Sequence, residues 1–213
     1  MATISLGQTS NNGNVQTQSI DRIYVSKATA SDSGTLETGK AWVNHTGTDA
    51  ATATSNFKLV VYSDTAGEPD ALLAVSDESS FFGTPEQQVS ATFTGSNRIS
   101  IVSGTDYWVG ICIEDAGVAS HAISRANTAD LGKIKNAEYT GGPLDPFGTP
   151  SFTLNGPYDI YMEFDTEGIP PGGGGGIVSV KSSGTFASSA TKVKLGGTFV
   201  SKTAKIKVGG SFS

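Results

Sequence analysis

Apolar and polar residues alternate with a period of two in several short stretches of the first 165 residues. The cleanest stretch is 158–165. Its inward face is predicted to hold Tyr158, Ile160, Met162 and Phe164, and its outward face Asp159, Tyr161, Glu163 and Asp165. This period is typical of a β-strand that packs one face on a core and turns the other to water.

Residues 106–114 are apolar on both faces, which indicates a central strand covered on two sides. Shorter strand patterns occur at 20–28, 36–43, 57–62, 71–75 and 88–93. Roughly eight or nine short strands with turn residues between them predict an all-β antiparallel β-sandwich of jelly-roll type. A barrel is the alternative arrangement, and the strand order cannot be read from these patterns.

The segment 168–176, Gly-Ile-Pro-Pro followed by five glycines, marks the clearest boundary in the chain. Two prolines give a short stiff exit, and the glycines then give a flexible joint. We therefore predict a β-sandwich domain over 1–167, a linker over 168–176 and a tail over 177–213.

The predicted tail holds three imperfect copies of one unit, spaced 13 residues apart. The repeated positions are Lys181, Lys194 and Lys207, and Phe186, Phe199 and Phe212. In each copy a Ser-Gly or Gly-Gly pair separates two short β-prone runs, which is a two-residue hairpin signal. Hairpins this small are marginal alone, so these six residues are predicted to serve anchoring or oligomerisation through stacking or docking.

The net charge of −6 conceals a polarity along the chain. Residues 1–167 carry 8 basic and 20 acidic residues, a net −12, whereas 168–213 carry six lysines and no acid. An acidic body and a basic tail indicate two surfaces with different partners. The alternative is that the lysines protect exposed strand edges, and both explanations can hold together.

Motifs that carry chemistry are not found in the sequence. Neither a nucleophile elbow, a phosphate-binding loop nor a zinc-binding His-Glu-x-x-His is present, and we expect no enzyme activity, cofactor or metal site. His45 and His121 are isolated and are interpreted as surface or strand-end residues. Cys112 lies in an apolar run and is interpreted as an inert core thiol.

Two aromatic residues are candidates for stacking on a sugar ring. Trp42 and Tyr161 each oppose the apolar face of their own strand and are expected to be exposed. The negative charge of the body disfavours nucleic acid as a partner. The sequence shows no secretory signal and no run approaching the roughly 20 apolar residues of a membrane span. We expect synthesis in a host cytoplasm and release as part of an assembled particle.

Residues 60–74, Val-Val-Tyr-Ser-Asp-Thr-Ala-Gly-Glu-Pro-Asp-Ala-Leu-Leu-Ala, precede Thr105-Asp-Tyr-Trp-Val-Gly-Ile111. This pair of motifs resembles a β-sandwich module of bacterial surface proteins and phage structural proteins, over residues 20–165. Lys192-Val-Lys-Leu-Gly-Gly-Thr-Phe199 and its next copy resemble the Val-Lys-Val-Gly-Gly-Thr-Phe repeats at the ends of phage virion proteins. The first copy departs from them at Ser182 and Ser183. Neither resemblance implies a catalytic residue.

The leading hypothesis is a non-enzymatic bacteriophage virion protein, either a tail or fibre component or a capsid decoration protein. Its partners would be other virion proteins or copies of itself, for example in a trimer. The alternative is a carbohydrate-binding module or adhesin that attaches to host-surface glycans through Trp42 and Tyr161. Particle-borne location and glycan binding are compatible with each other.

Overall fold

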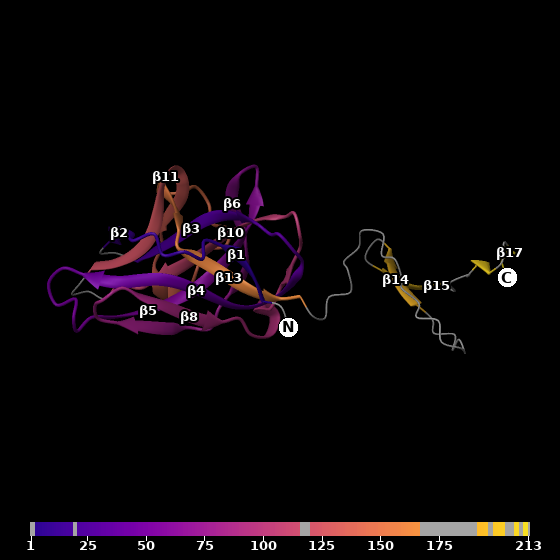
Figure 1. The fold of residues 1–213 in the computed structure, drawn as a ribbon, viewed down its shortest axis with the longest axis horizontal. Coiled ribbons are helices and arrows are strands. Elements are labelled where there is room, and N and C mark those ends of the chain that lie inside the picture. Colours follow the sequence, from indigo (N-terminus) through magenta and orange to yellow (C-terminus); the bar gives the residue numbers. More distant parts are fainter. Residues whose placement is uncertain are drawn as a thin grey trace. The chain divides into compact units, whose positions relative to one another are not determined.

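The computed structural model describes residues 3–18, 21–115 and 120–166, and four short strands near the C-terminus (Figure 1). The chain divides into two compact units, Met1–Gly174 and Gly175–Ser213. The predicted linker, 168–176, and the first repeat copy, 178–186, lie outside the described residues, so the predicted domain boundaries stay predictions.

The described part of the first unit is all-β and antiparallel, as predicted, and its only helical elements are the short 3-10 turns η1 (Gly95–Asn97) and η2 (Tyr139–Gly141). The thirteen strands belong to one hydrogen-bonded network. They are β1 (Thr3–Gly7), β2 (Asn14–Gln18), β3 (Arg22–Thr29), β4 (Gly34–Thr46), β5 (Thr54–Thr65), β6 (Glu68–Val75), β7 (Ser79–Phe82), β8 (Gln87–Thr92), β9 (Ser100–Ile101), β10 (Asp106–Ile113), β11 (Ser120–Asn136), β12 (Phe152–Tyr158) and β13 (Ile160–Asp165).

The long strand β11 joins two groups of strands. Its first residues, 120–123, pair with β4, which also pairs with β13 and β8, and β13 pairs with β1. Its last residues, 132–136, pair with β3, from which the order continues through β10 and β5 to β6. The main apolar cluster takes side chains from both groups, including Leu59 and Ile111 from one and Val43 and Met162 from the other. The two groups therefore share one core.

Strand β10 is buried on both faces, as its sequence predicts. Val109 and Ile111 lie in the main apolar cluster, whereas Trp108 and Cys112 lie in a second cluster on the opposite face. The middle residue of this stretch, Gly110, must be glycine, because a β-carbon there would overlap the carbonyl oxygen of Tyr24 on β3. The strand is therefore central, with β3 and β5 as its hydrogen-bonded neighbours.

The face of residues 158–165 that is predicted to be solvent-exposed is only partly exposed. The four inward residues are fully buried, as expected. The prediction is wrong for Asp159, which is 0% exposed, and for Tyr161, which is 8% exposed. Asp159 is buried because its carboxylate accepts hydrogen bonds from the backbone and side-chain amides of Asn12, at 2.7 and 2.5 Å. The polar segment before β2 therefore covers a position that alternation assigns to solvent.

The two histidines lie at strand ends, as one part of their interpretation has it, but the other part, that they are surface residues, is wrong. His45 on β4 and His121 on β11 lie opposite each other in the strand pairing, and both are completely buried. The Tyr24 hydroxyl lies 3.0 Å from His121 Nε2, and the Ser55 hydroxyl lies 3.0 Å from His45 Nε2. Burial lowers the pKa of His121 to about 4 and lowers that of His45 as well. Both rings are therefore neutral at pH 7.

In the second unit, β14 (Thr191–Leu195) pairs with β15 (Thr198–Lys202), and β16 (Lys207–Val208) pairs with β17 (Ser211–Phe212). Both pairs are antiparallel. The first copy lies outside the described residues, so the row of three hairpins stays a prediction.

The buried histidines predict a loss of stability in mild acid. In the unfolded chain each histidine side chain binds a proton near pH 6.5, whereas in the folded chain it stays neutral to lower pH. The free energy of unfolding therefore falls as the pH drops from about 6.5 towards 4. For His121 alone the loss is about 3 kcal/mol over this range. Urea denaturation of the wild type and His121→Gln at both ends of the range isolates this contribution, because glutamine keeps an acceptor for Tyr24 and does not titrate. Equal pH dependence in the two proteins would contradict it.

Candidate functional site

The strand pairing brings the two predicted sugar-stacking residues onto one face of the strands β4, β8 and β13. Trp42 lies opposite Gln88 of β8, and Tyr161 lies opposite Lys40 of β4. The Gln88 side-chain amide donates a hydrogen bond to the Tyr161 hydroxyl at 3.3 Å. Gln88 therefore links the two aromatic residues, although they are far apart in the sequence.

Tyr161 is not the exposed platform that the sequence predicts. Its ring is covered by Lys40, whose Nζ lies 5.7 Å from the ring centroid and 2.7 Å from the Glu163 carboxylate. Trp42 is half-buried. Of the two predicted residues, Trp42 is thus the one that retains accessible ring surface for a ligand.

Three buried polar atoms on neighbouring residues of this face have no hydrogen-bond partner among the described residues. They are Trp42 Nε1, a donor, and Asn44 Oδ1 and Glu86 Oε1, both acceptors. Asn11 donates to the other Glu86 oxygen at 2.6 Å. Buried polar atoms are normally paired, so these three residues have unused hydrogen-bonding capacity. We call them, together with Gln88, the Trp42 face. Sequence reasoning missed Glu86 because the pairing of β8 with β4, which sets Gln88 opposite Trp42, brings the start of β8 to this face. Asn44, two residues along β4 from Trp42, could have been found from alternation.

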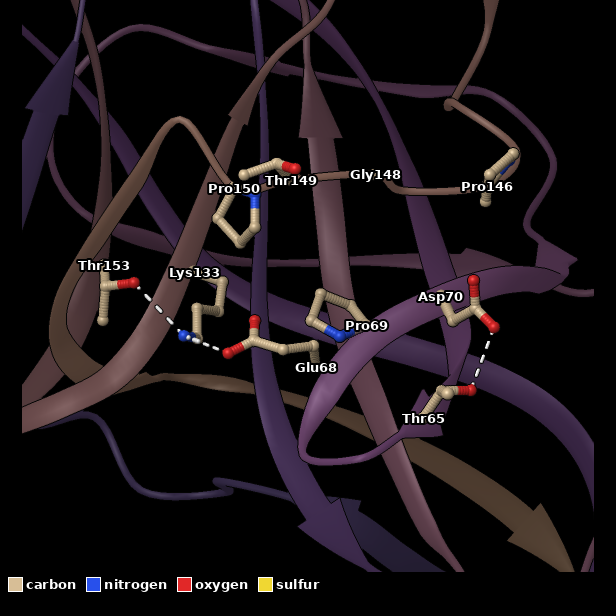
Figure 2. A pocket seen from close by; sticks show the side chains of 10 residues that line it. All are labelled: Thr65, Glu68, Pro69, Asp70, Lys133, Pro146, Gly148, Thr149, Pro150 and Thr153. Atoms are coloured by element: carbon tan, nitrogen blue, oxygen red, sulfur yellow. Dashed lines mark hydrogen bonds and ion pairs between the residues drawn. The ribbon is translucent and has the colours of Figure 1, made fainter.

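A separate open groove of ≈ 540 Å³ lies between the β5–β6 turn, strands β11 and β12, and the loop 146–150 (Figure 2). Lys133 of β11 donates to Glu68 at 2.9 Å and to Thr153 at 3.2 Å. Across Pro69, the Thr65 hydroxyl donates to Asp70 at 2.9 Å. The groove is therefore lined by hydroxyls, carboxylates and one ammonium group. Its other walls include the prolines Pro69, Pro146 and Pro150.

The loop that forms one wall of this groove is held firmly in place. Phe147 is completely buried and packs edge-to-face on Tyr62, with ring centroids 5.1 Å apart. Its backbone amide donates to the Asp70 carbonyl at 2.8 Å, and the Asp145 carboxylate accepts from the Leu72 amide at 3.0 Å. Lys135 donates to the Thr149 carbonyl at 2.6 Å. The same contacts occupy backbone groups of β6 that an edge strand would otherwise expose.

In the tail, the strand pairing sets the lysine and the phenylalanine that are predicted to anchor it opposite each other. Lys194 lies opposite Phe199 in the β14–β15 pair, and Lys207 lies opposite Phe212 in the β16–β17 pair. The same Lys–Phe pairing thus occurs at the same point of two successive copies. The equivalent residues of the first copy, Lys181 and Phe186, lie outside the described residues.

Cys112 and Asp64 are accounted for by their structural surroundings. Burial raises the pKa of the Cys112 thiol to about 12, so it stays protonated and unreactive at pH 7. Asp64 accepts hydrogen bonds from the Trp108 indole at 2.8 Å and the Gly67 amide at 3.2 Å. Within the described ranges, no three His, Cys, Asp or Glu side chains gather to hold a metal ion. No helix there has the length and apolarity to cross a membrane.

No protein-family model matches the chain, and no curated protein sequence is significantly similar to it.

The buried anchor of the groove wall gives a stability prediction. Phe147→Ala removes a fully buried ring from the second apolar cluster and should lower the free energy of unfolding by about 3–5 kcal/mol in urea denaturation. Phe82→Ala is the matched control, since Phe82 is 60% exposed and its loss should cost no more than about 0.5 kcal/mol. Equal effects of the two substitutions would show that Phe147 does not anchor the loop.

Proposed function

We propose that this chain is a non-enzymatic structural protein of a bacteriophage virion, as a tail or fibre component or a capsid decoration protein. The first unit is displayed on the particle, and the C-terminal repeats attach it or assemble it with copies of itself. The observation that carries the proposal is the recurrent pairing of Lys194 with Phe199 and of Lys207 with Phe212. A unit that repeats both its sequence and its pairing suits stacking against equivalent units.

The size of the tail hairpins supports the proposal. Strands β16 and β17 have two residues each, and β14 and β15 have five. Two-stranded hairpins of this length are marginal alone in water, so they gain stability from neighbouring copies or from another virion protein. The six lysines of 168–213 also favour a partner surface that carries negative charge.

The first unit suits display on a particle. We propose that its two groups of strands form a jelly-roll-like sandwich. One core is shared by both groups, and strand pairs such as β10 and β13 contact each other without being hydrogen-bonded neighbours. A domain with its own core can fold without the tail, which is what attachment through a linker requires.

Deletion of residues 168–213 tests attachment. We expect residues 1–167 to stay folded by circular dichroism, to sediment as a monomer, and to be missing from purified phage particles whose genome encodes only the truncated form. The full chain should sediment as an oligomer or join the particle. Incorporation of the truncated protein at full occupancy would contradict attachment through the tail.

A matched pair of full-length variants locates the attachment residues. Replacing Phe186, Phe199 and Phe212 together by alanine should lower oligomer or particle occupancy by about tenfold or more, because each ring supplies roughly 1–3 kcal/mol of apolar burial. The control replaces the preceding residues Thr185, Thr198 and Ser211 by alanine and should leave occupancy near the wild-type value. A larger loss in the control than in the phenylalanine variant argues against the rings as anchors.

Glycan binding by the Trp42 face is a second candidate function, that of a carbohydrate-binding module or adhesin. The specific observation in its favour is the unused donor of Trp42 beside the unused acceptors of Asn44 and Glu86. Sugar hydroxyls can satisfy donors and acceptors together, and an indole ring offers an apolar surface to the sugar C–H groups. This role is compatible with display on a particle.

A glycan array probed with the full chain tests this candidate. Trp42→Ala should abolish the signal, whereas Tyr161→Phe should reduce it only slightly, because the covered ring remains and only its hydroxyl is lost. Val102→Ala, at a residue that is 52% exposed, is the control and should bind as the wild type does. A positive signal that survives Trp42→Ala would exclude the Trp42 face as the binding site.

A further inference from the structure

We propose that the groove bordered by Glu68, Lys133, Pro146, Pro150 and Thr153 binds a neutral saccharide. This site is separate from the Trp42 face, and the proposal goes beyond attachment through the tail. It gives the displayed unit a ligand of defined chemical class.

The groove is already formed without a ligand. Its volume of ≈ 540 Å³ lies in the range of small-molecule sites. The wall 146–150 is held by the buried ring of Phe147 and by the hydrogen bonds of Asp145 and Lys135. The proline rings add no rotatable side chains. Little conformational entropy is therefore lost when a ligand enters, which favours binding.

The groove also offers a mixture of hydrogen-bond donors and acceptors. Glu68 is 53% exposed at its side chain, so its carboxylate has lone pairs available besides the one that Lys133 uses. The Lys133 ammonium has three N–H donors, of which two are directed to Glu68 and Thr153. The Thr153 hydroxyl accepts from Lys133 and retains its own proton to donate. Adjacent hydroxyls of a pyranose both donate and accept, which matches this set.

The charges around the groove favour a neutral ligand. Lys133 is already neutralised by Glu68, and Asp70 on the other side of Pro69 adds a second carboxylate, which offsets Lys135 at the wall beside Thr149. The first 167 residues carry a net charge of −12. Phosphorylated, sulfated or uronic acid ligands would be repelled, as would a nucleic acid. A neutral polyhydroxylated ligand avoids this repulsion, and its C–H faces can pack on Pro146 and Pro150.

The groove has no aromatic platform, so a single site should bind weakly, with a dissociation constant of about 0.1–10 mM. If several copies are displayed on one particle, linked sites raise the avidity by a factor of about 10²–10⁴ without new contacts. Weak single sites are thus sufficient for a protein that acts in many copies.

The test is an NMR titration of the full ¹⁵N-labelled chain with three neutral probes, maltotetraose, cellotetraose and tetra-N-acetylchitotetraose, and one anionic probe, tetragalacturonate. We expect at least one neutral probe to shift the amide signals of the non-proline residues among 65–70, 133 and 146–153. Tetragalacturonate should bind with an affinity at least about tenfold lower, because like charges repel. Equal or tighter binding of tetragalacturonate, or no shift with any neutral probe, would overturn the proposal.

Variants of the groove identify the site. Glu68→Ala and Thr153→Val should each lower the affinity for the neutral probe by about fivefold to tenfold, which is the effect of losing one hydrogen bond. Glu138→Ala makes the same chemical change at an exposed carboxylate that does not line the groove, and it should bind as the wild type does. If Trp42→Ala abolishes binding while Glu68→Ala does not, the saccharide binds the Trp42 face instead. Particle occupancy is measured separately, so failure of this proposal leaves attachment through the tail standing.

Discussion

Strand β10 has no solvated face, because apolar side chains cover it on both sides. One side is covered by the core that the two groups of strands share. On the other side, β3, β10 and β5 present Val25, Trp108 and Tyr62, which must also be shielded from water. The segment between β11 and β12 provides that cover with Tyr139 and Phe147. The position of this segment is therefore set by hydrophobic burial rather than by regular secondary structure.

The groove follows from the same constraint. Once Phe147 is buried against Tyr62, the residues after it run along the β5–β6 turn and back towards Lys135. The apolar ring points inward, which leaves Thr149 and the flanking prolines at the surface. A loop that covers a core thus also shapes a polar cavity on its outer side. Stability of the second apolar cluster and the geometry of the groove are coupled through one side chain.

Much of the fold can be predicted from alternation, because inward positions of each strand need apolar side chains. The four inward residues of 158–165 and the two apolar faces of β10 follow directly from this rule. The rule fails where a distant segment adds cover, as Asn12 does over Asp159 and Lys40 over Tyr161. Alternation places His45 on the inward face with Ala41 and Val43, and Ser55 provides the polar partner that its ring needs inside the core. Such partners are set by long-range strand pairing, which local patterns do not contain.

The candidate sites were less predictable than the fold for the same reason. Trp42 could be selected from its strand face, as could Asn44 two residues along it, but Gln88 and the preceding Glu86 join them only through the pairing of β8 with β4. The groove combines the β5–β6 turn with Lys133 of β11 and Thr153 of β12, which lie more than sixty positions further along the chain. In contrast, the pairing of Lys194 with Phe199 is local, and the spacing of the repeat was enough to predict a hairpin there.

We propose that the tail is the assembling part of the protein and that the first unit is displayed. Hydrogen exchange followed by mass spectrometry, on the free chain and on the assembled particle or oligomer, distinguishes the two roles. We expect amides of residues 178–212 to gain strong protection on assembly, whereas protection across 21–115 and 120–166 should stay as it is in the free chain. Gained protection across the first unit, with none in residues 178–212, would contradict it.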